Sequence, residues 1–141
     1  MIKLTNKRIS IIFTGLILLA GMRCNESTSS QASVEISMND FISAHKSDSN
    51  IKVLDVRESN EYAQGHVPKA VLAPLSALQS PSAQIEKLVP FSKDEKIYVI
   101  CRSGKRSLAA VSILKGFGYS NAVSVQSGTQ GWIDSGNETV K

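Results

Sequence analysis

Residues 96–107 have the sequence Lys-Ile-Tyr-Val-Ile-Cys-Arg-Ser-Gly-Lys-Arg-Ser. The first half is β-branched and aromatic, which predicts a buried strand that ends at Cys101. A loop follows over residues 102–106, and apolar side chains at helical spacing then predict a helix over residues 107–115. A strand that runs through a short loop into a helix is the repeating unit of α/β folds.

The neighbouring segments repeat this alternation. The expected strands are short and continuously apolar, which is typical of a parallel sheet covered on both faces. We therefore expect one α/β domain over residues 34–141, with a small, mostly parallel sheet and helices on both faces. Ligands of such sheets bind beyond the carboxyl ends of the strands, where Asp55 and Cys101 are expected. The expected strands lie at 51–55, 71–73, 96–101 and 121–126, and the expected helices at 37–45, 59–64, 81–89, 107–115 and around residue 132.

The loop after the central strand favours an anionic sulfur at Cys101. The helix that follows presents unpaired N–H groups and the positive end of its dipole. Gly104 allows the loop to curl so that successive N–H groups point inward. The side chains of Arg102, Lys105 and Arg106 add three positive charges. We therefore expect a thiol pKa below the free value of about 8.5, and a nucleophilic thiolate.

A second interpretation of this cysteine stays open. Cysteine is among the most buried residue types, so Cys101 could be an inert core residue beside a solvated basic turn. It is the one cysteine of residues 34–141. A single cysteine can form neither an internal disulfide nor, alone, a zinc site.

The net charge of +4 is located at the N-terminus. Residues 1–23 hold four basic and no acidic residues, and removing those four from the total of 16 leaves 12, which the 12 acidic residues balance. The domain itself is therefore expected to be neutral, and we predict no nucleic-acid binding from its charge.

Residues 1–23 have the pattern of a targeting segment. Lys3, Lys7 and Arg8 precede an uncharged apolar stretch over residues 9–22. That stretch is shorter than the ~20 residues of a membrane-spanning helix and fits the hydrophobic region of a signal peptide better. We expect a signal peptide or an N-terminal membrane anchor, with the remainder exported to the periplasm or held at the membrane.

Cys24 follows this segment directly. Its position resembles the lipidated cysteine of bacterial lipoproteins, although Arg23 replaces the small residue that this pattern places before the cysteine. Lipidation of Cys24, cleavage elsewhere and an uncleaved anchor therefore all stay open. Residues 24–33 are small and polar, and we expect a flexible linker there.

Three ordered motifs resemble those of the rhodanese family. The Cys-Arg-x-Gly-x-Arg pattern of that family's active-site loop matches residues 101–106. Its first signature resembles Asp-Val-Arg, Glu-Tyr and Gly-His-Val-Pro within residues 55–68, and its closing segment resembles residues 123–132. The family often has two adjacent glycines in that segment, and Ser127 stands in place of the first. The resemblance covers about residues 34–132 and implies the rhodanese fold.

The resemblance also implies an activity. It implies a sulfurtransferase that moves sulfur from thiosulfate, a persulfide or a polysulfide to a thiol or cyanide, without metal or organic cofactor. Cys101 would be the nucleophile that carries the persulfide. Asp55 and Arg57 would support the site through an ion pair, and Arg106 could equally be held in one. The loop residues expected to bind a small anionic donor are Arg102, Ser103, Gly104, Lys105 and Arg106.

Several other functions compete with this one. Related phosphatases and arsenate reductases place an arginine six positions after the cysteine, whereas Arg106 is five after Cys101. A non-catalytic persulfide carrier or a protein-binding module would keep the same fold without turnover. A redox sensor is also open, because an accessible thiolate of low pKa is readily oxidised.

Overall fold

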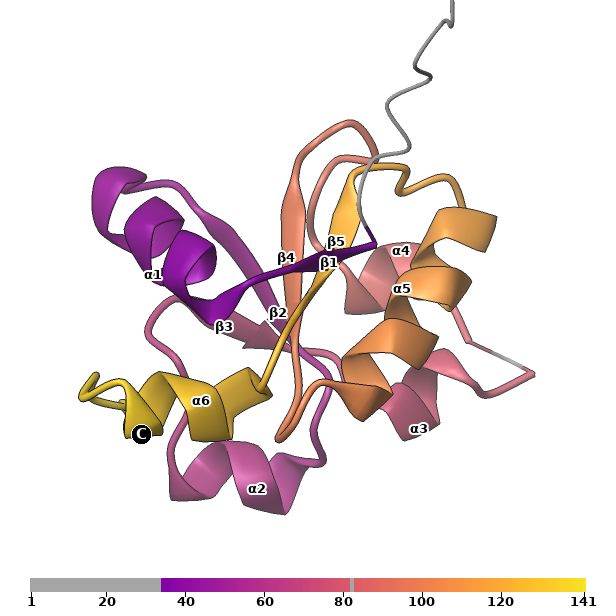
Figure 1. Ribbon diagram of the computed structural model, residues 1–141. Coiled ribbons are helices and arrows are strands. Elements are labelled where there is room, and N and C mark those ends of the chain that lie inside the picture. The colour runs from indigo at the N-terminus through magenta and orange to yellow at the C-terminus, as the bar shows by residue number, and fades with distance from the viewer. Residues whose placement is uncertain (1–33, 82) are drawn as a thin grey trace, which may run out of the picture. The chain divides into compact units, whose positions relative to one another are not determined.

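A computed structural model describes residues 34–81 and 83–141, and these form a five-stranded sheet between two layers of helices (Figure 1). Every strand pairing is parallel, and the strand order is β1-β5-β4-β2-β3. The predicted α/β fold is confirmed. The strands are β1 (Glu35–Ile36), β2 (Lys52–Asp55), β3 (Ala70–Leu72), β4 (Ile97–Ile100) and β5 (Ala122–Val125).

The helices cover both faces of the sheet, as predicted. In Figure 1, α1 and α6 lie on one side of the sheet and α3, α4 and α5 on the other, with α2 below the sheet. The start of α1 follows from its sequence, because the Ser37 hydroxyl accepts a hydrogen bond from the Asp40 N–H at 3.2 Å. The helices are α1 (Met38–Ser47), α2 (Ser59–Gln64), α3 (Leu75–Leu78), α4 (Ile85–Leu88), α5 (Lys105–Gly116) and α6 (Gly128–Asp134).

The core has two halves, one on each face of the sheet. Neighbouring residues of a strand point to opposite faces, so Val53 packs in the cluster that includes Trp132 of α6, and Leu54 packs in the cluster that includes Leu114 of α5. Every residue of β4 and β5 is buried. Full burial of one such side chain contributes about 1.5–3 kcal/mol, so this double-sided core holds the carboxyl ends of the strands in place.

Some element boundaries differ from the prediction. The short edge strand β1 and the single turn α3 have too few residues to show a periodic pattern, and neither is predicted. Among the described residues of the predicted helix 81–89, one turn forms, which is α4. Helix α5 begins at Lys105 rather than at residue 107, because Gly104 adopts a left-handed conformation with φ 99° and serves as the N-cap.

The predicted N-terminal features lie outside the described residues. These are the signal or anchor over residues 1–23, the linker over residues 24–33 and the lipidation site at Cys24. Within the described ranges, no helix combines the length and the apolarity needed to cross a membrane.

Candidate functional site

The parallel sheet brings two of the predicted site residues to one edge. Asp55 ends β2 and is in register with Ile100, the last residue of β4. The Val56 N–H extends the ladder by donating to the Ile100 carbonyl at 2.9 Å. Cys101 follows Ile100 directly, so Asp55 and Cys101 lie at the same carboxyl edge of the sheet, as the predicted topology requires.

The sulfur of Cys101 lies inside the loop that joins β4 to α5. The Gly104 N–H donates to Sγ at 3.1 Å, and the Ser107 hydroxyl oxygen lies 3.5 Å from Sγ. Cys101 is only 1% exposed. The left-handed conformation of Gly104 turns its N–H inward, which is the curled loop that the sequence predicts.

The loop favours the thiolate form. Burial alone raises the pKa of the Cys101 thiol, but hydrogen bonds from the Ser107 hydroxyl and from the backbone N–H groups of Ser107, Ser103 and Gly104 outweigh it, so the pKa lies below its ordinary value. The predicted direction is confirmed. The inward-facing N–H groups are among the predicted causes, whereas the Ser107 hydroxyl is not predicted and the charges of the loop are not among the leading causes.

The hydroxyl group of Ser107 is a site feature that sequence reasoning missed. Its oxygen lies 2.8 Å from the Gly104 carbonyl oxygen and 2.8 Å from the Ser124 hydroxyl oxygen. Both serines are fully buried. A signal for this pair is present in the sequence, since Ser124 interrupts the apolar strand β5 and Ser107 occupies a core-facing position in the first turn of α5.

Arg106 is held in an ion pair rather than left free for a ligand. Its Nη1 and Nη2 donate to Glu61 Oε2 and Oε1 at 2.6 and 2.7 Å. These bonds lower the pKa of Glu61 from 4.5 to about 2. Of the two roles considered for Arg106, the structure therefore favours the structural one. Arg102 and Lys105 are exposed and have no ion-pair partner among the described residues, so they remain the cations available to an anionic donor.

Asp55 and Arg57 form the expected ion pair, and it is buried. Arg57 Nη2 lies 2.7 Å from Asp55 Oδ2, and the exposed fractions of the two side chains are 7% and 0%. Nε and the backbone N–H of Arg57 also donate to this carboxylate, and Nη2 donates to the Gly65 carbonyl at 2.9 Å. The pair thus fastens the end of β2 to the end of α2.

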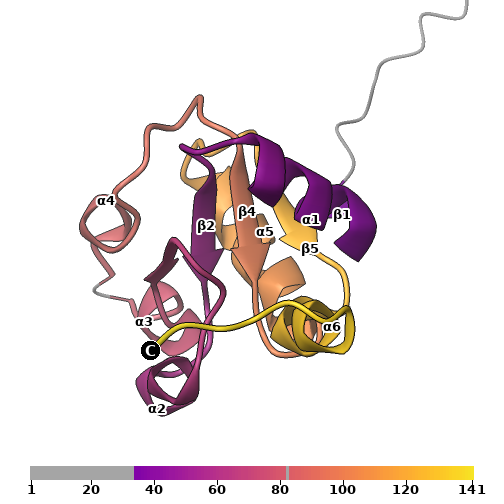
Figure 2. The ribbon, with the colours of Figure 1, turned by 90° about the vertical axis from the view of Figure 1, so that its left-hand side faces the viewer.

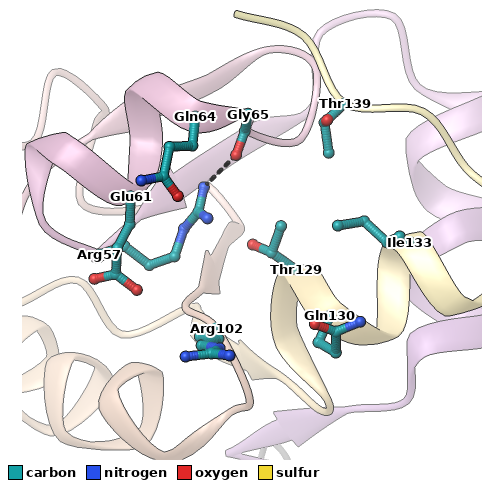
Figure 3. A pocket seen from close by; sticks show the side chains of 9 residues that line it. All are labelled: Arg57, Glu61, Gln64, Gly65, Arg102, Thr129, Gln130, Ile133 and Thr139. Atoms are coloured by element: carbon teal, nitrogen blue, oxygen red, sulfur yellow. Dashed lines mark hydrogen bonds between the residues drawn. The ribbon is translucent and has the colours of Figure 1, made fainter.

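A polar pocket of about 310 Å³ adjoins this loop. Figure 3 shows its side chains arranged around one hollow between α2 and α6. Two hydrogen bonds join α6 to the loop, because the Thr129 N–H donates to the Cys101 carbonyl at 2.7 Å and the Gln130 N–H donates to the Arg102 carbonyl at 3.1 Å. The lining residues are Arg57, Glu61, Gln64, Gly65, Arg102, Thr129, Gln130, Ile133 and Thr139.

The residues after α6, which we call the C-terminal tail (136–141), supply one wall of this pocket. His66 and Val140 exchange two backbone hydrogen bonds, each of 2.9 Å, and the Trp132 Nε1–H donates to the Glu138 carbonyl at 2.8 Å. Figure 2 shows the tail running from α6 toward α2. Thr139 is thereby placed against Gly65, at the pocket wall.

Comparison with known proteins shows a consistent set of relatives. A family model described as the rhodanese-like domain matches residues 38–135. The putative sulfur carrier protein YrkF of Bacillus subtilis is 33% identical over 98 residues, which cover 70% of this chain and 50% of that protein. This chain therefore spans about half the length of that curated relative.

Two solved structures extend the comparison to three dimensions. A rhodanese-related protein from Thermoplasma volcanium superposes with a TM-score of 0.62 at 36% identity, covering 75% of this chain and 96% of that one. The human single-domain sulfurtransferase TSTD1 superposes with a TM-score of 0.59 at 25% identity, covering 72% and 96%. Both structures are matched over nearly their whole length.

Proposed function

The chain belongs to the rhodanese-like family of sulfurtransferases and sulfur carriers, and from this membership we propose that it transfers sulfane sulfur through a persulfide on Cys101. One observation supports this proposal most directly. The sulfur of Cys101 accepts the Gly104 N–H at 3.1 Å inside a loop whose hydrogen bonds lower the thiol pKa. A sulfur held in this way is a ready nucleophile.

In the first step, the Cys101 thiolate attacks the outer sulfur of a donor such as thiosulfate. A new S–S bond forms, the S–S bond of thiosulfate breaks, and sulfite leaves with the electron pair of that bond. The outer sulfur of the resulting persulfide carries the negative charge. The inward-facing N–H groups of the loop stabilise this charge, and Arg102 and Lys105 attract the anionic donor.

In the second step, a thiol or cyanide attacks the outer sulfur of the persulfide. The bond between the two sulfurs breaks, and the Cys101 thiolate is the leaving group. Since the loop stabilises that thiolate, it also makes Cys101 a good leaving group, so one set of hydrogen bonds serves both steps.

The first prediction concerns loading with sulfur. Thiosulfate should add one sulfur atom to the full chain, as measured by intact-protein mass spectrometry. The Cys101→Ser variant should gain none, because the attacking atom is removed, and the Cys24→Ser variant should gain it as the natural chain does. Equal gain by Cys101→Ser would refute the assignment of the nucleophile.

Carriage and catalysis differ in their stoichiometry. A carrier delivers its sulfur once to a partner, whereas an enzyme releases many equivalents of sulfite or thiocyanate per chain. Continuous release of thiocyanate from thiosulfate and cyanide supports the enzyme. Loading without continued release supports the carrier, which is the function in the name of the Bacillus relative.

We also propose that the protein is exported and acts in the periplasm or at the membrane. This proposal relies on the charge and apolarity of residues 1–23 and on the position of Cys24.

A further inference from the structure

The loading step proposed above is confined to the Cys101 loop, which leaves the polar pocket beside that loop without an assigned role. Thiosulfate is small, and in the proposed mechanism the loop itself binds it. The pocket, at about 310 Å³, has room for roughly ten water molecules and falls within the ~300–1,000 Å³ typical of small-molecule sites. Its volume therefore suits an organic molecule rather than a small inorganic anion.

The side chain of Thr129 brings to this pocket a hydroxyl group without a hydrogen-bond partner in the described part of the chain. The residue is 3% exposed, and its Oγ1 is buried without any hydrogen-bond partner among the described residues. Buried hydroxyl groups are almost always hydrogen-bonded, because leaving one unpaired costs free energy. Figure 3 shows the Thr129 side chain turned into the same hollow as Arg57. A ligand atom that accepts or donates a hydrogen bond would satisfy it.

The charges around Thr129 favour an anionic group. Arg57 uses Nε and Nη2 for its hydrogen bonds within the described residues, which leaves Nη1 to face a ligand. Arg102 brings a second guanidinium without an ion-pair partner there. The one carboxylate of the pocket, Glu61, is already neutralised by both terminal nitrogens of Arg106. An anion in the pocket would thus be close to hydrogen-bond donors and would experience little electrostatic repulsion.

We propose that this pocket binds the sulfur acceptor, and that the acceptor is a small thiol that carries a carboxylate. The carboxylate would accept hydrogen bonds from the Thr129 hydroxyl, Arg57 Nη1 and Arg102. The Thr129 N–H donates to the Cys101 carbonyl, and Arg102, the residue after Cys101, lines the pocket, so a ligand bound here adjoins the loop that would carry the persulfide. This inference rests on the proposed function, since it concerns the second step of the same reaction.

Transfer of sulfur from the persulfide to this acceptor needs no further reagent. The acceptor thiolate attacks the outer sulfur of the Cys101 persulfide and forms a new S–S bond. The bond between that sulfur and Cys101 Sγ breaks, its electron pair returns to Sγ, and the acceptor leaves as a persulfide. The pocket raises the local concentration of the acceptor and orients its thiol.

The test uses the full chain, first loaded with thiosulfate and freed of excess donor. Loss of the added sulfur is then followed by mass spectrometry with 3-mercaptopropionate, with neutral 2-mercaptoethanol and with cationic cysteamine. Thr129→Val keeps the shape of the side chain and removes its hydroxyl. The rate ratio of 3-mercaptopropionate to 2-mercaptoethanol should fall about tenfold in this variant, as expected for one lost hydrogen bond to a charged group. Comparing ratios cancels the intrinsic reactivity of each thiol.

Two further variants separate binding from folding. Thr129→Ser retains the hydroxyl and should restore most of the ratio, whereas Ser112→Ala, which alters an exposed hydroxyl on α5, should not change it. Thr129→Val should also melt at the natural temperature or above it, because an unpaired buried hydroxyl stabilises nothing in the free protein. A clear loss of thermal stability would instead assign Thr129 a structural role.

The outcomes distinguish this inference from the proposed function. If the chain gains sulfur and passes it on, but Thr129→Val leaves the ratio unchanged, the pocket is not the acceptor site and the sulfurtransferase proposal stands. If the natural chain gains no sulfur at all, the proposed function itself is wrong.

Discussion

The Ser107 hydroxyl lies within reach of three groups, namely the sulfur of Cys101, the carbonyl of Gly104 and the hydroxyl of Ser124. A hydroxyl donates only one proton. When sulfur is a thiol, it can donate to Ser107, and the Ser107 proton goes to Gly104. When sulfur is a thiolate, rotation of the Ser107 hydroxyl turns its proton to the sulfur, while Ser124 can donate to the Ser107 oxygen. The two buried serines thus adapt to the charge of the sulfur.

Substitution of Ser107 tests this adaptation. Ser107→Ala should raise the pKa of the Cys101 thiol by about one to two units, because a hydrogen bond to a charged group contributes about 1.5–3 kcal/mol and one pKa unit equals about 1.4 kcal/mol. Less thiolate is then present near neutral pH, and loading with thiosulfate slows there. Ultraviolet absorbance of the thiolate, followed as a function of pH, measures the pKa. The same titration of the Cys101→Ser variant gives the absorbance due to Cys24.

Ser103→Ala is the matched control for Ser107. Ser103 acts on the sulfur through its backbone N–H, which alanine retains, so the pKa should stay at its natural value. An unchanged midpoint in Ser107→Ala would show that the backbone N–H groups suffice to hold the anion.

At the scale of elements, the Glu61–Arg106 ion pair joins α2 to the first turn of α5. The two residues are 45 positions apart, and each side chain is about two-thirds buried. Through this pair, the helix that carries the active-site loop is fixed against the helix that lines the pocket. The ion pair therefore positions the loop relative to the pocket.

The strength of this ion pair depends on pH. The pKa of Glu61 is lowered from 4.5 to about 2, so its stabilisation is complete above about pH 4.5 and declines as the pH falls toward 2. Glu61→Gln should reduce the free energy of unfolding by about 1 kcal/mol near neutral pH, the upper range for a partly exposed pair. Urea denaturation should show a smaller difference at about pH 3.

The exposed pair between Glu86 and Lys93 provides a comparison on another helix. Glu86→Gln should change stability less than Glu61→Gln, because water screens the charges of that pair. A difference between Glu61→Gln and the natural chain that grew with acidity would contradict the assigned direction of the Glu61 pKa.

At the carboxyl edge of the sheet, the connection between β5 and α6 packs very closely against the active-site loop. A Cβ at Gly128 would collide with the backbone of Cys101 and Arg102, so only glycine permits α6 to pack against the active-site loop. Ser127 adopts a left-handed φ of 62°, a conformation that favours glycine. The serine that departs from the family pattern thus keeps the turn, at some cost in backbone strain.

At the scale of the whole molecule, the sequence predicts the sheet, the flanking helices and the lowered pKa of the Cys101 thiol, because apolar periodicity and loop composition are local properties. It does not reveal the partner of Arg106 or the neighbour of Ser107, since those contacts join segments 45 and 17 positions apart. The pocket is missed for the same reason. Its walls come from α2, the loop after β4, α6 and the C-terminal tail, and they meet only in the folded chain.

The uneven distribution of charge along the chain leads to a prediction about the mature protein. Loss of residues 1–23 removes four positive charges and leaves 12 basic against 12 acidic residues. If the protein is exported and cleaved near Cys24, its isoelectric point should fall from about 9.2 to near neutrality. Isoelectric focusing of the protein from cells, beside the unprocessed chain made in vitro, measures this shift. A protein from cells that focuses with the unprocessed chain would contradict cleavage.

The C-terminal tail has a practical consequence for anyone who makes this protein. Its backbone pairs with His66 and sets Thr139 against the pocket, only two residues before Lys141. An affinity tag fused behind Lys141 would place a bulky, often charged peptide at the mouth through which we expect acceptor thiols to enter. Selectivity among thiols is therefore best measured on material from which any such tag has been removed.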